Sequence, residues 1–240
     1  MKKESKNKLL IITIFAIAMG FLEAAVVVYL RNLFYPAGFD FPLKGFLNPS
    51  ILGVEWLREF ATIVMLIIIA MLAAKKFHER FAYFLYAFAI WDLFYYISLK
   101  LTLDWPASLL TWDLLFLIPW PWIGPVLAPI LCCILFIAMT FIIINAEDSG
   151  TKIKIKAKEG LLMILGIILV LYTWLYDYAK IIIGGGFSKD FFTLSNNPEF
   201  MKVIANYSPS YYNWPVFLAG IIIAAIGIKL FYFRTKRLKN

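Results

Sequence analysis

Three acidic side chains, Glu23, Asp92 and Asp177, stand inside otherwise apolar stretches of this 240-residue chain. A charge at the centre of a membrane-spanning helix costs roughly 2.5–3.5 kcal/mol on insertion scales. Such a residue usually has a buried ionic partner, a wet cavity or a transported ion. Carboxylates in these surroundings bind cations, relay protons or act as general acids and bases. These three residues are therefore the first candidates for a functional site.

The composition indicates that the chain lies in a lipid bilayer. Hydrophobic residues make up 62% of it, charged residues only 16%, and the mean hydropathy is +0.81. Soluble domains are nearer a half apolar and a quarter charged. The net charge of +8 is compatible with a nucleic-acid partner, but the basic residues cluster beside the apolar segments. That placement is typical of membrane topology, so we expect no nucleic-acid partner.

The apolar segments predict an all-α, polytopic integral membrane protein with a single membrane domain over residues 1–240. A span needs about 20 mainly apolar residues, and six segments meet this requirement. The lysines before the first segment resemble a signal peptide, but its apolar run is too long, so we expect an uncleaved anchor. The six predicted transmembrane helices are residues 9–30, 55–74, 81–103, 126–144, 160–183 and 214–233.

A stretch rich in proline and tryptophan precedes the fourth predicted helix. Pro106, Pro119, Pro121 and Pro125 interrupt residues 104–125, so a continuous span is excluded there. We expect a broken or re-entrant segment with a short helix after Asp113, whose carboxylate could cap that helix.

Basic residues predict the orientation. Of the 23 lysines and arginines, 15 fall in four segments that six spans place on one side: the N-terminus, the loops after spans two and four, and the C-terminus. The positive-inside rule then predicts that both termini are cytoplasmic. The run Phe21–Arg31 resembles bacterial membrane proteins, so the expected location is the bacterial cytoplasmic membrane.

Helical spacing groups the remaining polar residues in the outer half of the spans. Asp92, Tyr96 and Lys100 share one face at i, i+4 and i+8, and the small Gly20 next to Glu23 allows another helix to approach. Spans one, two, three and five are expected to converge on one charged cluster. The candidate ligand- or ion-binding residues are Glu23, Arg58, Glu59, Asp92, Tyr96, Lys100 and Asp177, with Asp113 and Trp112 as a possible outer rim. The alternative is a set of buried ion pairs that fixes the helix arrangement.

Several chemistries lack the residues they need. The only histidine, His78, lies in a basic loop, and the adjacent Cys132 and Cys133 match no zinc or redox spacing, so no metal site is predicted. The sequence contains no phosphate-binding glycine loop and identifies no cofactor.

Three function classes remain open. The first is a small transporter or ligand-binding protein with an outward-facing pocket. The second is a membrane-embedded enzyme acting on a lipid or isoprenoid, in which the acids supply general acid–base chemistry or hold a divalent metal. The third is an accessory subunit whose charges pair with another membrane protein. The expected partners are the lipid bilayer and either a small ligand or other membrane subunits.

Overall fold

The computed structural model describes residues 1–42, 49–187, 194 and 197–237. Within these residues six long helices are apolar and long enough to cross a membrane, which confirms the predicted all-α polytopic architecture. A short seventh helix and one pair of strands complete the fold. The elements are α1 (Lys3–Phe34), α2 (Pro49–Ala73), α3 (Phe77–Leu103), β1 (Trp112–Phe116), β2 (Trp122–Pro125), α4 (Leu127–Asp148), α5 (Ala157–Gly184), α6 (Pro198–Ile204) and α7 (Trp214–Arg237).

Several helices extend beyond the predicted spans. The first helix starts at Lys3 rather than residue 9, and its first turns contain an ion pair of 2.8 Å between Glu4 and Lys8. Pairs at i and i+4 stabilise a helix by a few tenths of a kcal/mol. Helix α2 starts at Pro49 rather than residue 55, since proline is well tolerated in a first helical turn.

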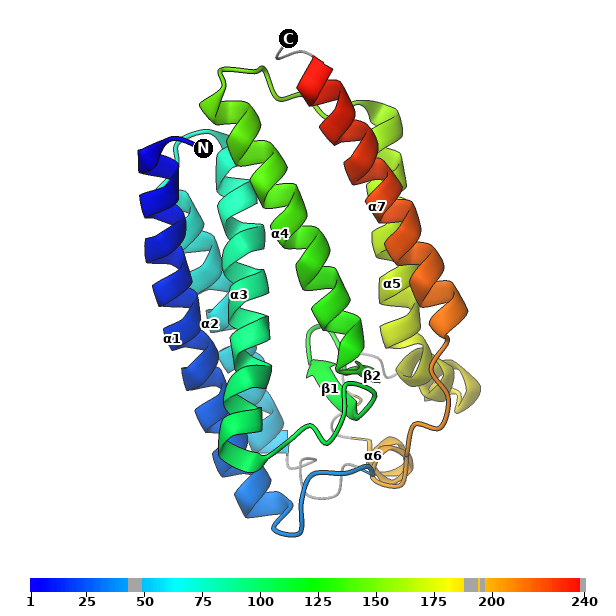
Figure 1. The fold of residues 1–240 in the computed structure, drawn as a ribbon. Coiled ribbons are helices and arrows are strands. Elements are labelled where there is room, and N and C mark those ends of the chain that lie inside the picture. Colours follow the sequence, from blue (N-terminus) through cyan, green and yellow to red (C-terminus); the bar gives the residue numbers. More distant parts are fainter. Residues whose placement is uncertain (43–48, 188–193, 195–196, 238–240) are drawn as a thin grey trace.

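The six long helices form two groups. Helix α3 packs against α1, α2 and α4, whereas α5 pairs with α7 (Figure 1). The α5–α7 crossing is close, because a Cβ added to Gly166 would lie 2.6 Å from the carbonyl oxygen of Gly220. The groups join where α4 meets α7 and where β2 meets α5. The prediction that span five joins spans one, two and three in one cluster is therefore wrong, since α5 packs on α7 instead.

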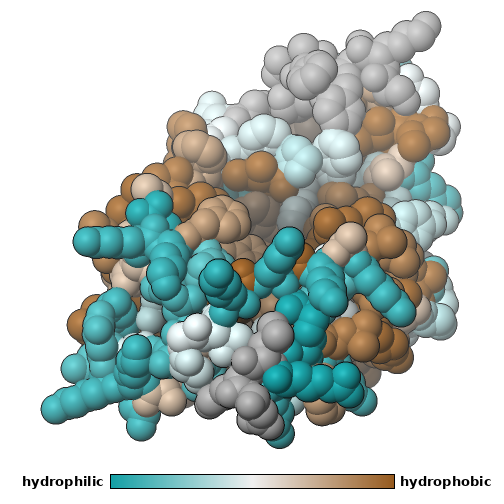
Figure 2. All heavy atoms as spheres, turned by 90° about the horizontal axis from the view of Figure 1, so that it is seen from above, coloured by the Kyte–Doolittle hydropathy of each residue, from teal (hydrophilic) through white to brown (hydrophobic). Residues whose placement is uncertain are grey.

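Both termini lie at the same end of the bundle, and the hairpin of β1 and β2 lies towards the other end (Figure 1). We call these the termini end and the hairpin end. Hydrophilic side chains gather over the termini end, and hydrophobic side chains cover its flanks (Figure 2). Acidic partners there include Glu147 beside Lys76 and Glu159, which accepts from Arg234 Nε at 2.6 Å.

The broken segment before α4 is an antiparallel hairpin, so the predicted short helix after Asp113 is wrong. The register pairs Asp113 with Gly124 and Leu114 with Ile123, with an irregularity between Leu114 and Phe116. Two further backbone bonds, Val126 N to Thr111 O and Leu127 N to Leu109 O, extend the pairing to the start of α4. Closely spaced prolines exclude a helix here, while the flanking aromatic and branched residues favour strands.

Candidate binding pocket

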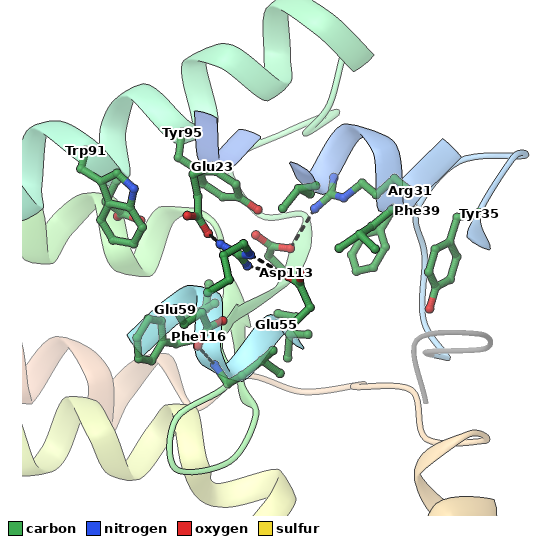
Figure 3. Close-up of a pocket in the computed structure, with 17 residues that line it drawn as sticks. Glu23, Arg31, Tyr35, Phe39, Glu55, Glu59, Trp91, Tyr95, Asp113 and Phe116 are labelled. Carbon is green, nitrogen blue, oxygen red and sulfur yellow. Dashed lines mark hydrogen bonds and ion pairs between the residues drawn. The ribbon is translucent and has the colours of Figure 1, made fainter. Parts of the chain in front are cut away.

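A cavity of about 80 Å³ lies at the hairpin end, between α1, α2, α3 and the hairpin. Figure 3 shows Arg31 and Asp113 pointing towards each other and Glu23, Glu55 and Glu59 around the same space. Among the charged residues that line it in the described part of the chain, carboxylates outnumber cations. Its acids are Glu23, Glu55, Glu59, Asp92 and Asp113, and its cations are Arg31 and Arg58.

Gly20 sets the distance between α1 and α3. A Cβ at this position would lie 2.7 Å from the carbonyl oxygen of Trp91 and 3.0 Å from the amide nitrogen of Tyr95. Only a residue without a side chain permits this approach. The contact brings the turn of α3 that carries Asp92 next to the turn of α1 that carries Glu23, as the small-residue spacing predicted.

Arg58 is the central cation of the pocket. Its Nε and Nη2 donate to Oε2 of Glu55 at 2.9 and 2.7 Å, and its Nη1 donates to Oε1 of Glu23. Thr62, one turn further along α2, donates to the other oxygen of Glu23 at 3.3 Å. One guanidinium therefore serves two carboxylates, joining α1 to α2 and leaving a net negative charge when both are ionised.

Glu59 connects α2 to the hairpin. Its Oε2 accepts a hydrogen bond of 2.8 Å from the backbone nitrogen of Leu117, just after β1, and the side chain is buried. A buried backbone donor without a partner would be costly, so this carboxylate fixes the position of the turn. Its bond to the backbone is therefore an anchor for the hairpin against α2.

Asp92 has a weaker set of partners. Cys133 of α4 donates its thiol hydrogen to Oδ2 at 3.3 Å, and no ion pair to Asp92 is found in the described part of the chain. A thiol is a weak donor, so it compensates little of the charge of this partly buried carboxylate. Asp92 is thus the pocket acid with the least protein compensation.

Asp113 projects from β1 into the pocket and is 1% exposed. Its Oδ1 accepts from Arg31 Nη2 and its Oδ2 from the hydroxyl of Tyr96, each at 3.1 Å. Burial raises the pKa of Asp113 to about 6, against the opposing effects of the Arg31 charge and the Tyr96 hydroxyl. The residue expected at the outer rim is therefore at the centre of the polar network.

Aromatic rings enclose the guanidinium of Arg31. Its Cζ lies 4.2 Å from the ring centroid of Phe39 and 3.7 Å from that of Trp105. Trp105 in turn stacks on Tyr96 at 6.4 Å. Cation–π contacts of this kind stabilise a buried guanidinium while leaving its edge N–H groups available for hydrogen bonds.

The predicted site residues divide into two sets. The structure brings Glu23, Arg58, Glu59, Asp92 and Asp113 to the cavity lining, and the hydroxyl of Tyr96 donates to Asp113. The other predicted residues lie elsewhere. Lys100 pairs with the exposed Asp104 at 2.7 Å, Asp177 is hydrogen-bonded to Tyr207 beside α5, and Trp112 packs edge-on against Tyr212.

Other pocket residues were missed among the candidates, although spacing could have found two of them. Arg31 follows Glu23 at i+8 on the same face of α1, and Glu55 precedes Glu59 at i+4 on α2. Tyr35 and Tyr95 also line the cavity, and nothing in the sequence pattern identifies them. Cys133, for which the sequence predicted no metal or redox role, bonds to Asp92 because the packing of α4 on α3 brings them together.

Among the described residues, one group has the geometry of metal ligands, and it lies at the termini end. Ligand atoms of His78, Glu79 and Glu147 are within 4.8 Å of one another. The His78 Nε2 is 2.6 Å from Glu147, and Lys76 contacts the same carboxylate. A lysine ammonium beside Glu147 would repel a metal cation, so we interpret the group as an ion-pair network that joins α3 to α4.

No family model, curated protein or solved structure matches this chain. The pocket geometry and the membrane-spanning helices therefore carry the functional argument.

Proposed function

We propose that this multi-pass membrane protein binds a small cation or cationic ligand in the pocket and acts as a small transporter or ligand-binding protein. The observation that carries this proposal is the charge imbalance around one cavity. Five carboxylates line it against two guanidinium groups. Ionised carboxylates removed from water are costly unless a cation or a proton compensates them. The pocket therefore favours a positively charged occupant.

The arrangement of partners supports cation binding rather than a closed set of ion pairs. Arg58 already serves Glu23 and Glu55, and Arg31 serves Asp113. Asp92 accepts only a weak thiol hydrogen bond among the bonds found in the described residues. Intramembrane acids with incomplete compensation are typical of ion and proton pathways.

We also propose that the termini are in the cytoplasm and that the pocket belongs to the outer half of the bacterial cytoplasmic membrane. The positive-inside rule supports this orientation, since most basic residues belong to the segments at the termini end. The pocket lies at the hairpin end, so its ligand would come from the outside.

The test measures whether cations raise the melting temperature of the purified protein in nanodiscs. Tryptophan fluorescence is the signal that reports unfolding. Na⁺, K⁺ and ethanolamine are the probes, because a ligand that binds only the folded state stabilises it by about 2.7 kcal/mol at 100 times its Kd. We expect at least one probe to raise the melting temperature. Asp92→Asn and Glu59→Gln, which keep the side-chain shape, should weaken that probe at least tenfold.

Asp177→Asn is the matched control, because Asp177 is an acid of a spanning helix that lies outside the pocket lining. It should retain the response of the wild type. The proposal fails if none of the probes stabilises the wild-type protein, or if Asp177→Asn weakens binding as much as Asp92→Asn does. Proteoliposome flux of the probe that binds then distinguishes a transporter from a binding protein.

A further inference from the structure

Three acids of the pocket each have one carboxylate oxygen that the protein does not use. In Glu55, Glu59 and Asp92 the Oε2 or Oδ2 atom accepts a hydrogen bond from the protein. The second oxygen of each has no hydrogen-bond partner among the described residues, and all three residues line the cavity. None of these oxygens belongs to the fully enclosed polar atoms without a partner, so a ligand in the cavity can reach them.

Two of these acids are otherwise well buried, which makes their unpaired oxygens informative. Glu55 is 4% exposed and Glu59 is 7% exposed. A carboxylate removed from water is costly unless donors compensate it, and native structures rarely leave such an atom unpaired without a reason. N–H donors supplied by a cationic ligand would remove that cost.

The unpaired oxygens do not converge on one point. Among the described residues, three acidic or histidine ligand atoms come within 4.8 Å of one another only at His78, Glu79 and Glu147. Oxygens around a Ca²⁺ ion lie about 2.3–2.6 Å from it, so neighbouring ligands are roughly 3–4 Å apart. Acceptors around one ammonium nitrogen are roughly 4.7 Å apart, since N–H···O bonds are about 2.9 Å long. The wider spacing in the pocket favours a cation whose N–H groups are spread over several nitrogen atoms.

Aromatic rings form much of the remaining wall of the cavity. Trp91 precedes Asp92 in the chain, and Phe116 precedes the residue whose amide donates to Glu59. Figure 3 shows Trp91, Glu59 and Phe116 on the side of the pocket away from Arg31. Aromatic rings bind weakly hydrated organic cations through cation–π contacts. The described aromatic residues of the lining are Tyr35, Phe39, Trp91, Tyr95 and Phe116.

The pocket already uses guanidinium groups of its own in both of these ways. Arg58 donates to Glu23 and to Glu55, which belong to different helices. The guanidinium of Arg31 contacts two aromatic rings while one of its edges donates to an aspartate. A guanidinium is planar, spreads its charge over three nitrogen atoms and is weakly hydrated. It therefore combines separated N–H donors with a face that packs against rings.

From these observations we infer that the pocket binds a small guanidinium compound, whose N–H groups donate to the unpaired oxygens on α2 and α3 and whose plane packs against the aromatic wall. This inference rests on the proposed cation-binding function and specifies its ligand. A cavity of about 80 Å³ has room for roughly five to eight water-sized groups. That room matches methylguanidinium, which presents the same planar set of N–H donors as an arginine side chain.

The test compares cations of different shape in nanodiscs of phosphatidylglycerol, a lipid without an amino group. The affinity of each probe comes from the concentration dependence of the melting temperature. Methylguanidinium is used well below the concentrations that denature proteins. Ethanolamine and ethylenediamine carry N–H donors without the planar group, tetramethylammonium carries no N–H donor, and Na⁺, K⁺ and Ca²⁺ are simple ions. We expect methylguanidinium to bind at least tenfold more tightly than each of the others.

Two variants assign the binding to the wall and to the unpaired oxygens. Phe116→Leu removes a ring but keeps an apolar side chain, so the affinity for methylguanidinium should fall about fivefold, the loss of one cation–π contact. Asp92→Asn removes the charge of one acceptor and should lower that affinity at least tenfold. Phe60→Leu is the control for the ring, because Phe60 is an exposed residue of α2 outside the cavity lining. It should leave the affinity unchanged.

Three results would overturn the inference. In the first, Na⁺, K⁺, Ca²⁺, ethanolamine or ethylenediamine binds as tightly as methylguanidinium, which leaves the cation pocket intact but removes the preference for the planar group. In the second, tetramethylammonium binds as tightly, so that N–H donors have no role. In the third, Phe116→Leu weakens methylguanidinium no more than Phe60→Leu does. Failure of every cation to bind would contradict the proposed function as well.

Discussion

Arg31 and Asp113 form a buried ion pair, with Nη2 of Arg31 donating to Oδ1 of Asp113 at 3.1 Å. The pair joins the end of α1 to the first strand of the hairpin, which are more than 80 residues apart in the chain. Both side chains are more than 90% buried, so the surrounding protein controls their electrostatics. The stability of the hairpin end should therefore depend on the protonation of Asp113.

The first prediction concerns pH. Burial raises the pKa of Asp113 from 3.8 to about 6, so the folded protein holds this proton more tightly than the unfolded chain does. The resulting stabilisation is complete below pH 4 and is lost as the pH rises through 6. Relative to Asp113→Asn, the wild type should lose on the order of 3 kcal/mol between pH 4 and pH 7. The groups facing Asp113 are Arg31 of α1, Asp92, Tyr95 and Tyr96 of α3, and, across the same cavity, Glu23, Glu55, Arg58 and Glu59.

Melting temperatures of the two proteins in detergent, measured across that pH range, test this prediction. Because the other carboxylates are present in both proteins, the difference between the two curves isolates Asp113. Parallel curves would show that Asp113 has no raised pKa. A difference that grows in the opposite direction would mean that the Arg31 charge outweighs burial.

The second prediction concerns Gly20. Gly20→Ala places a Cβ 2.7 Å from the backbone oxygen of Trp91, and backbone cannot move aside as a flexible side chain can. We expect a loss of about 1–3 kcal/mol, typical of an overpacked contact. The control is Gly53→Ala in α2, where nothing lies within 4 Å of the added Cβ. That change should be neutral or stabilising by up to about 1 kcal/mol, since alanine favours helices. Equal melting temperatures for the two variants would argue against the close α1–α3 contact.

The sequence predicted the spans and much of the pocket because both depend on local patterns. Long apolar runs define the six helices, and helical spacing placed Asp92 and Tyr96 on one face of α3. The position of Asp177 could not be predicted this way, because hydropathy does not determine which helices become neighbours. Its helix packs on α7 through Gly166 and Gly220, and its carboxylate bonds to Tyr207.

The role of Asp113 was missed for a different reason. A single acid before an apolar stretch is compatible with a helix cap as well as with a strand. Pro119 and Pro121 argued against a helix, but the register that pairs Asp113 with Gly124 depends on long-range packing. Lys100 was misplaced because its long side chain reaches the exposed Asp104 rather than the pocket.

The third prediction concerns Arg58. Arg58→Gln leaves Glu23 and Glu55 close together without their shared cation, and removing one partner of a buried ion pair typically costs about 3–5 kcal/mol. Adding Glu55→Gln should recover part of that loss, because one uncompensated charge is then removed. A double-mutant cycle by thermal unfolding measures this coupling. Lys100→Gln, which breaks an exposed pair, should change stability by no more than about 1 kcal/mol. Additive losses at Arg58 and Glu55 would contradict the shared-cation arrangement.

The fourth prediction concerns the orientation of the protein in the membrane. Ala107 follows α3 at the hairpin end and Ser149 follows α4 at the termini end, and both are exposed. In intact bacterial cells, a membrane-impermeant thiol reagent should label Ala107→Cys but not Ser149→Cys, whereas permeabilised cells should show labelling at both. The native protein is the control for background, since Cys133 is buried and Cys132 is partly buried. Labelling of Ser149→Cys alone in intact cells would show that the orientation is opposite to the proposed one, with the pocket facing the cytoplasm.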